Sequence, residues 1–199
     1  MTGLFDLPLL PGLQLADDVI TPAEEQVLIA CIDAAKLTPF QFGNYQGKRL
    51  TRSFGAHYDF GRQRLQETEA VPKWLLPLRQ RAAAFAGLQP DDLGHVLLIR
   101  YDPGTGIGWH KDRPAFDQVI GVSLGAAADL AFRRRRADGR FDRCRVPLPA
   151  RSAYLLTGPA RWEWEHGIAA HASLRYSVTF RSFAAVTNGS AIGKVGVQS

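Results

Sequence analysis

The chain has 199 residues, of which 46% are hydrophobic and 22% charged, which is enough for one globular domain with a single sizeable core. Its 24 lysines and arginines exceed its 19 acidic residues, and the resulting net charge of +5 suits a nucleic-acid partner and a basic soluble enzyme equally. No apolar run approaches the roughly 20 residues that span a membrane, and no basic region precedes an apolar stretch at the N-terminus, so we expect neither a membrane protein nor a signal peptide.

Two helices are predicted in the first half of the chain, after an irregular lead-in. Thr21 can cap a helix, and Glu24, three residues later, completes a capping box. Apolar residues at helical spacing follow, so we expect a helix over 22–37. A second apolar stripe opens at Pro72 and ends at Gly87, which predicts a second helix between them.

The two cysteines, Cys31 and Cys144, lie far apart and do not have the spacing of a metal site. Because cytosolic proteins rarely hold disulfides, we interpret both as reduced thiols and expect a cytoplasmic protein. We also expect a monomer.

Between the two helices, residues 43–61 mix aromatic with basic and polar side chains and are predicted to form a hairpin. One interpretation is an ordinary surface hairpin with its aromatic side chains tucked inward. The other is a lid that stacks a flat substrate such as a base and places arginines near phosphates. The interleaving of aromatic and basic residues favours the lid, with substrate contacts from Arg49, Arg52, Phe54 and Tyr58.

From residue 94 onward the sequence indicates short strands separated by turns such as Asp138-Gly139 and Gly158-Pro159. Strands are expected at 94–101, 118–124, 128–134, 141–147, 152–157, 161–165 and 173–183. The fold class is therefore α+β and mainly β, a jelly roll braced by two N-terminal helices in a single domain. Residues 1–93 would supply the helices and the hairpin, 94–183 the jelly-roll core, and 187–199 a flexible tail.

The stretch Arg100–Asp112 leaves an apolar strand, passes through a glycine-rich loop and ends in a His-x-Asp pair. In an extended chain residues i and i+2 point to the same side, so the His110 imidazole and the Asp112 carboxylate can face one point. With a second histidine they would form the two-histidine, one-carboxylate set of non-haem Fe(II) oxygenases. A His-x-Asp pair alone occurs often by chance, so the interpretation depends on the other parts.

Two later histidines can supply the third ligand, His166 and His171. We favour His166 because it ends a patterned strand. His171 stands among small residues, in what we interpret as a loop whose length is free to vary.

A strand near the C-terminus supplies a possible anion site. Its alternation points four polar side chains to one side: Arg175, Ser177, Thr179 and Arg181. One interpretation is a solvent-facing strand. The other is a dicarboxylate site, because two buried arginines need anionic partners and guanidinium grips carboxylate in a bidentate fork. Beside an iron triad the second is favoured, since 2-oxoglutarate needs both a metal and a cation.

The motifs occur in an order that resembles the AlkB family of Fe(II)/2-oxoglutarate-dependent dioxygenases. They are Tyr101-x-Pro103-Gly104, His110-x-Asp112, Ser123-Leu124-Gly125, Pro149-x-Arg151-Ser152, Trp164-x-His166-Gly167-Ile168 and the strand Leu174–Arg181. The block from Phe54 to Phe60 is similar to the family's nucleotide-recognition hairpin. The resemblance implies a double-stranded β-helix fold.

The resemblance to the AlkB family also implies roles for the matching residues. His110, Asp112 and His166 would hold Fe(II). Arg175 and Arg181 would hold the carboxylates of 2-oxoglutarate. Tyr101 would add a hydrogen bond to one of them, and the Ser177 hydroxyl would stand where the family often has asparagine.

The sequence departs from the pattern of the DNA-repair members at two positions, one near the cosubstrate and one near the substrate. Ile99 stands two residues before Tyr101, where DNA-repair members have asparagine, so one cosubstrate contact is missing or replaced. Pro114 stands two residues after the metal carboxylate, where repair members tend to have an acidic side chain. The Tyr-x-Pro-Gly-x-Gly-Ile and Trp-x-His-Gly-Ile stretches are closer to the branch that acts on modified wobble uridines in tRNA.

The leading hypothesis is therefore an enzyme that uses Fe(II), 2-oxoglutarate and O₂ to hydroxylate or demethylate an alkylated or modified base in DNA or RNA, with succinate and CO₂ as coproducts. An alternative is the same chemistry on a protein or small molecule. A second alternative, of another class, is a nucleic-acid-binding module that has lost turnover.

Seven arginines cluster around the Asp138-Gly139 turn, and four of them form the run Arg133–Arg136. They form either a solvated hairpin or a phosphate-contacting ribbon beside the pocket, whose contribution would weaken steeply with salt. Because side chains alternate along a strand, only half of the run can share one face.

Overall fold

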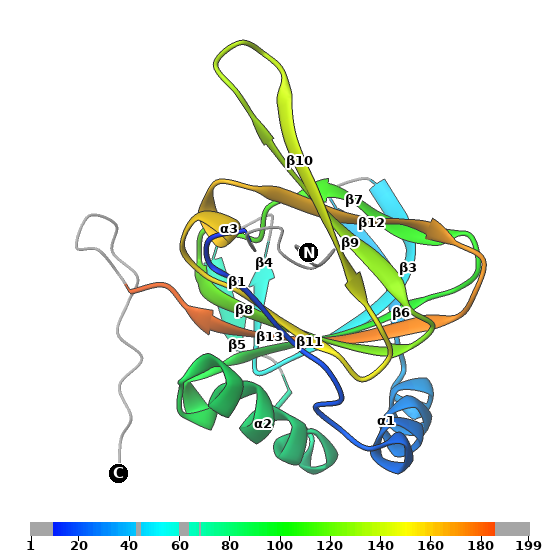
Figure 1. The fold of residues 1–199 in the computed structure, drawn as a ribbon. Coiled ribbons are helices and arrows are strands. Elements are labelled where there is room, and N and C mark those ends of the chain that lie inside the picture. Colours follow the sequence, from blue (N-terminus) through cyan, green and yellow to red (C-terminus); the bar gives the residue numbers. More distant parts are fainter. Residues whose placement is uncertain (1–9, 43–44, 60–63, 68, 186–199) are drawn as a thin grey trace, which may run out of the picture.

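The computed structural model describes residues 10–42, 45–59, 64–67 and 69–185. The predicted flexible tail lies outside the described residues. Two antiparallel sheets face each other (Figure 1), in the strand orders β1-β11-β8-β13-β6-β3-β2 and β10-β9-β12-β7, and β4 and β5 form a separate pair. The prediction of a mainly β jelly roll is confirmed.

The α-helices are α1 (Pro22–Ala34), α2 (Leu76–Ala86) and α3 (Gly158–Trp162), and two short 3-10 helices, η1 (Lys73–Leu75) and η2 (Pro90–Asp92), flank α2. The strands are β1 (Leu13–Ala16), β2 (Thr38–Phe42), β3 (Tyr45–Phe54), β4 (Ala56–Asp59), β5 (Arg64–Glu67), β6 (His95–Tyr101), β7 (Thr105–His110), β8 (Phe116–Gly125), β9 (Ala128–Arg135), β10 (Phe141–Leu148), β11 (Ala153–Leu156), β12 (Glu165–His171) and β13 (Arg175–Phe183). No helix among these described residues is long and apolar enough to cross a membrane.

Local chemistry caps the start of α1 and the end of α2. The backbone N–H of Glu24 donates to Thr21 Oγ1 at 3.2 Å, and the N–H of Thr21 donates to the Glu24 carboxylate at 2.8 Å. Helix α1 ends at Ala34, short of residue 37, because Pro39 of β2 disfavours helical geometry just before it. Helix α2 ends against Gly87, whose φ of +68° provides a left-handed cap.

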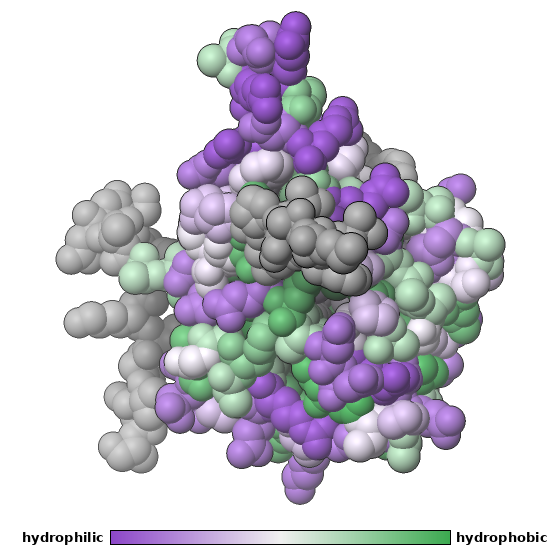
Figure 2. Space-filling view, viewed as in Figure 1, coloured by the Kyte–Doolittle hydropathy of each residue, from purple (hydrophilic) through white to green (hydrophobic). Residues whose placement is uncertain are grey.

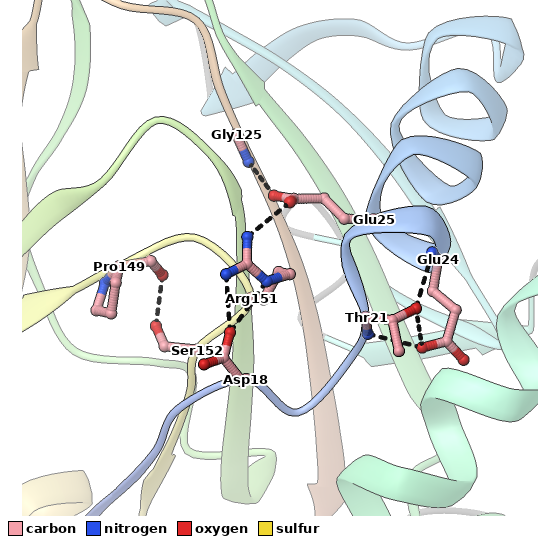
Figure 3. Close-up of polar contacts among 8 residues, drawn as sticks. All are labelled: Asp18, Thr21, Glu24, Glu25, Gly125, Pro149, Arg151 and Ser152. Atoms are coloured by element: carbon pink, nitrogen blue, oxygen red, sulfur yellow. Dashed lines mark hydrogen bonds and ion pairs between the residues drawn. The ribbon is translucent and has the colours of Figure 1, made fainter.

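A polar clamp fixes the start of α1 to the larger sheet (Figure 3). The Arg151 guanidinium donates to Asp18 at 2.8 and 3.0 Å and to Glu25 at 3.3 Å. The buried Glu25 carboxylate also accepts the backbone N–H of Gly125 at 2.8 Å. Because the charges of Arg151 and Glu25 are paired with each other, the cost of burying them is compensated. The contacts hold the start of α1 beside β8 and β11.

The larger sheet separates an apolar core under the helices from a cavity between the two sheets. Helices α1 and α2 lie on its outer face (Figure 1) and share one core cluster with alternate residues of β8 and β13. On β13 these are Tyr176, Val178 and Phe180, each at most 2% exposed. The intervening residues of β13 point between the two sheets and line a cavity; they are Arg175, Ser177, Thr179 and Arg181.

Two predictions about local structure are wrong. The strand expected at 161–165 is helix α3 followed by the start of β12, because Pro159 in the first turn favours a helix after the Thr157 cap. The alternation of exposed Trp162 with buried Trp164 imitates a strand pattern. His166 therefore lies near the start of β12 and His171 at its end, so neither stands where the sequence placed it.

The glycine-rich stretch before His110 is a strand, β7, and not a loop. It packs so closely on β12 that a Cβ on Gly106 would overlap the carbonyl of Ile168. Here glycine permits two backbones to approach closely. A glycine-rich sequence does not show whether its glycines serve such an approach or a flexible loop.

Candidate active site

The pairing of β7 with β12 brings three candidate metal ligands together. His110 ends β7 and stands directly opposite His166 of β12, and Asp112 follows two residues after His110. One ligand atom from each residue lies within 4.8 Å of those of the other two. His166 Nε2 is 3.4 Å from Asp112 Oδ2, and the two imidazole centroids are 4.3 Å apart.

The electrostatics of the triad suit a divalent metal. Burial lowers the pKa of His110, and burial together with His110 lowers the pKa of His166 to about 3. Burial alone would raise the pKa of Asp112, but Arg181 and the two histidines outweigh it and hold the pKa well below its usual value. At neutral pH the cluster is therefore two neutral imidazoles and a carboxylate, the forms that bind metal.

Two details fit a cation between these side chains. Asp112 Oδ2 is buried and has no hydrogen-bond partner among the described residues, so it has an acceptor that a cation would satisfy. His110 Nδ1 lies 2.9 Å from the carbonyl oxygen of Gly108, and because a carbonyl only accepts, Nδ1 carries the proton. The lone pair of His110 is thereby left on Nε2, the usual arrangement of a metal-bound histidine.

Arg181 holds the carboxylate of this triad in place. Its Nε and Nη2 donate to Asp112 Oδ1 at 2.8 and 2.7 Å, and its Nη1 donates to Nδ1 of buried His95 at 3.2 Å. The second carboxylate oxygen of Asp112 stays available for metal. The sequence resemblance implied a cosubstrate carboxylate as the partner of Arg181; in the structure Arg181 contacts the metal-site carboxylate within the same cavity.

Arg175 has the features of an anion site. It is 1% exposed, and its Nη2 donates to Ser123 Oγ at 3.1 Å. Its Nε and Nη1 are buried and have no hydrogen-bond partner among the described residues. A buried guanidinium with two unused donors is costly unless an anion binds it, and a carboxylate matches its geometry.

The remaining predicted cosubstrate residues surround Arg175. Tyr101 pairs with Arg175 across β6 and β13, and the guanidinium lies 5.2 Å from the centre of its ring. Ser177 is 4% exposed and pairs with Ile99 on the same two strands. The triad and all four of these side chains line one cavity of about 790 Å³ between the two sheets.

The sequence match to known proteins agrees with this geometry. A family model described as the 2OG-Fe(II) oxygenase superfamily matches residues 13–181. The chain belongs to this superfamily.

Its curated relatives include several AlkB proteins, so the resemblance found in the sequence is confirmed. The chain is 28% identical to tRNA (carboxymethyluridine(34)-5-O)-methyltransferase ALKBH8 of Macaca fascicularis, over 79% of the chain and 24% of that protein. It is 28% identical to the Alkylated DNA repair protein ALKBH8 homolog of Arabidopsis thaliana, over 81% and 52%. It thus spans a quarter to a half of these relatives' length.

A solved structure supports the fold. The structure of OsALKBH1 covers 87% of this chain, and the chain covers 98% of that structure, with a TM-score of 0.66 and 16% sequence identity. At this identity the likeness shows the oxygenase jelly roll alone.

The predicted substrate residues divide between the two faces of β3. Arg49 lines the oxygenase cavity and lies over the ring of Phe40 at 3.9 Å. Arg52 and Phe54 are an odd number of residues from Arg49, so they lie on the opposite face of the strand, away from the cavity. Arg52 pairs with Glu69 at 2.7 Å, and Phe54 is 3% exposed in the core under the helices.

Neither Arg52 nor Phe54 therefore lines the cavity, because strand alternation gives only every second residue to it. Tyr58 lies in β4, whose side chains are outside the described part of the chain.

Among the cavity residues that sequence reasoning missed are Trp109, Arg161 and Trp162. Arg161 is 2% exposed and donates to the carbonyl oxygens of Arg113 and Phe116 at 2.6 Å, so it ties α3 to the segment that follows Asp112. The mistaken strand at 161–165 concealed it. The position of Trp109 next to His110 was the sequence feature that could have indicated its place at the cavity.

Proposed function

We propose that this protein is an Fe(II)- and 2-oxoglutarate-dependent dioxygenase that oxidises an alkylated or modified base in nucleic acid and releases succinate and CO₂. One observation carries the proposal: the His-Asp-His cluster shares a single cavity with a buried arginine that has unused donors. A metal and a dicarboxylate would each complete groups that are otherwise unsatisfied.

His110, Asp112 and His166 would hold the iron, which when bound couples O₂ and the decarboxylation of 2-oxoglutarate to oxidation of a substrate C–H bond. Three protein ligands leave coordination positions for cosubstrate and O₂. Arg181 keeps Asp112 ionised and oriented through the two hydrogen bonds to Oδ1.

Arg175 would bind the far carboxylate of 2-oxoglutarate with its Nε and Nη1 donors, and Tyr101 and Ser177 lie beside it as further hydrogen-bonding groups. Ile99 has no polar group to take part. The cosubstrate would thus rest on β13 and β6, with its other end toward the triad.

A nucleic-acid substrate is supported by the relatives and by the cavity rim. Probable RNA/DNA demethylase ALKBH6 of Danio rerio is 26% identical over 74% of this chain and 59% of that protein, and the ALKBH8 relatives carry tRNA and DNA repair in their names. Trp109, Trp162 and Arg49 line the cavity, and both tryptophans are partly exposed. Such groups can stack a base and contact phosphate.

The test is product formation with the purified protein, Fe(II) and 2-oxoglutarate. Succinate and formaldehyde would be measured with methylated single-stranded DNA, methylated RNA, tRNA and a pool of methylated peptides. We expect product from a nucleic acid and none from His110→Ala, with Arg136→Gln on the distant hairpin as a matched control. Succinate coupled to peptides alone would refute the substrate class, and unchanged succinate in His110→Ala would refute the site.

A further inference from the structure

The hairpin of β9 and β10 extends away from the jelly roll (Figure 1) and its tip is strongly hydrophilic (Figure 2). Cross-strand partners in an antiparallel pair point to the same side, and Arg143 pairs with Arg133, Phe141 with Arg135 and Asp142 with Arg134. The hairpin therefore has two different faces. We name them the paired face (Arg134, Arg136 and Asp142) and the ladder face (Arg133, Arg135, Phe141, Arg143 and Arg145).

The arginines of the paired face are neutralised by the protein itself. Arg134 bonds Glu163 at 2.8 Å and Asp142 at 3.2 Å, and Arg136 also pairs with Asp142. Two cations thus meet two carboxylates. Little net charge remains on this face to attract a polyanion.

The ladder face alternates aromatic rings with guanidinium groups. Arg133 lies 4.7 Å from the ring centre of Trp109 and 4.9 Å from that of Phe141, and Arg143 lies 5.5 Å from Phe141. These distances are within the range of cation–π contact. The result is a stack in the order Trp109, Arg133, Phe141, Arg143.

This stack is exposed and retains positive charge. Trp109 is 38% exposed and Phe141 37%. Glu165 pairs with Arg133, and Arg145 makes a long, solvated contact of 3.4 Å to Asp129. Arg135 and Arg143 make no ion pair with any described residue, so two cations of the ladder face are uncompensated.

The stack leads to the reaction site. Trp109 immediately precedes His110 and also lines the cavity, and Glu165, the partner of Arg133, immediately precedes His166. Because neighbouring residues of a strand point to opposite sides, Trp109 and Glu165 lie on the outer side of β7 and β12, whereas His110 and His166 face the cavity.

We propose that the ladder face binds single-stranded nucleic acid beside the nucleotide that enters the cavity. Aromatic rings interleaved with cations are the means by which proteins hold single strands, because every unpaired base offers a π-face and every nucleotide a phosphate. A duplex hides its base faces and suits this surface less well. The inference rests on the proposed function and adds to it the strand state of the substrate and its path.

The experiment is fluorescence anisotropy with the full chain and a short labelled oligo(dT), alone and annealed to its complement, over a range of salt concentrations. The variants are Phe141→Ala and Arg143→Gln on the ladder face and Arg136→Gln on the paired face, which removes the same charge. Melting temperature and succinate formation without substrate serve as checks that each variant keeps its fold and its metal site.

We expect wild type to bind the single strand more tightly than the duplex. Phe141→Ala should weaken single-strand binding about 5- to 150-fold, the range for losing one stacked base. Arg143→Gln should lower the slope of log affinity against log salt by about 0.7, and Arg136→Gln should leave it unchanged.

Each contrary result has a distinct meaning. If wild type binds oligo(dT) but Phe141→Ala and Arg143→Gln bind like Arg136→Gln, the ladder inference fails and the proposed function stands. Equal binding of the duplex, or equally effective competition by a polyglutamate peptide, also overturns the ladder inference. If wild type binds no nucleic acid and forms product with peptides, the proposed substrate class fails as well.

Discussion

Replacing Arg175 with methionine should have opposite effects on cosubstrate binding and on the stability of the cosubstrate-free protein. Methionine has a similar length and fills the same volume without charge. The change removes Nε and Nη1, the two buried donors that have no partner in the described chain, together with the hydrogen bond from Nη2 to Ser123.

The magnitude follows from these donors. A hydrogen bond to a charged group contributes about 1.5–3 kcal/mol, so losing the charged contact to a carboxylate should raise the Kd for 2-oxoglutarate about 10- to 150-fold. A buried donor without a partner costs about 1–3 kcal/mol, and this cost disappears in the variant. After the loss of the Ser123 hydrogen bond, we expect Arg175→Met without 2-oxoglutarate to be at least as stable as wild type.

The assay is thermal unfolding with Mn(II) in place of iron and increasing 2-oxoglutarate. Cosubstrate at about 100 times Kd should stabilise wild type by about 2.7 kcal/mol, which for a chain of this size raises Tm by roughly 5–11 °C. Arg175→Met should start at or above the wild-type Tm and respond little. Exposed Arg145→Met is the control and should respond like wild type.

A variant that binds 2-oxoglutarate as tightly as wild type would refute the assignment of Arg175 as the carboxylate anchor. A strong loss of stability without cosubstrate would refute the argument that its donors are unsatisfied in the free protein.

Two further predictions concern buried charge and pH. Arg181→Met leaves the Asp112 carboxylate buried without its ion pair, so the free energy of unfolding should fall by about 3–5 kcal/mol in urea denaturation without metal; a loss below about 1 kcal/mol would contradict the role of the pair. Burial and the hydrogen bond to Asp33 raise the pKa of Tyr176 to about 12 from about 10 in the unfolded chain. The contribution of Tyr176 to the free energy of unfolding is complete below about pH 10. It is lost as pH rises toward 12, because only the unfolded chain releases the proton between these pH values. Denaturation across this range should show a decline that Tyr176→Phe lacks, and identical pH profiles would argue against the raised pKa.

Local patterns predicted the parts of the protein that depend on near neighbours. The capping box at Thr21 and the glycine at position 87 set helix boundaries through contacts within a few residues, and both occur in the structure. The spacing of His110 and Asp112 and the alternation on β13 also follow from extended backbone geometry. These features needed only the type of secondary structure to be right.

Other features could not be predicted from the sequence because they depend on what a segment packs against. The pattern around Trp162 has the periodicity of a strand, and a single proline in the first turn of α3 decides for a helix. Arg52 and Arg49 are equivalent in the sequence, but the register of β3 on β6 turns only Arg49 into the cavity.

The sequence by itself indicated the chemistry of the site: which side chains can bind a metal and which can bind a dicarboxylate. Tertiary structure decided which histidine completes the triad, because the register of β12 on β7 sets His166, and not His171, opposite His110. It also decided that Arg181 supports Asp112 while Arg175 keeps free donors. Distances of a few ångströms between segments far apart in the chain are fixed by sheet register and packing, which no local pattern encodes.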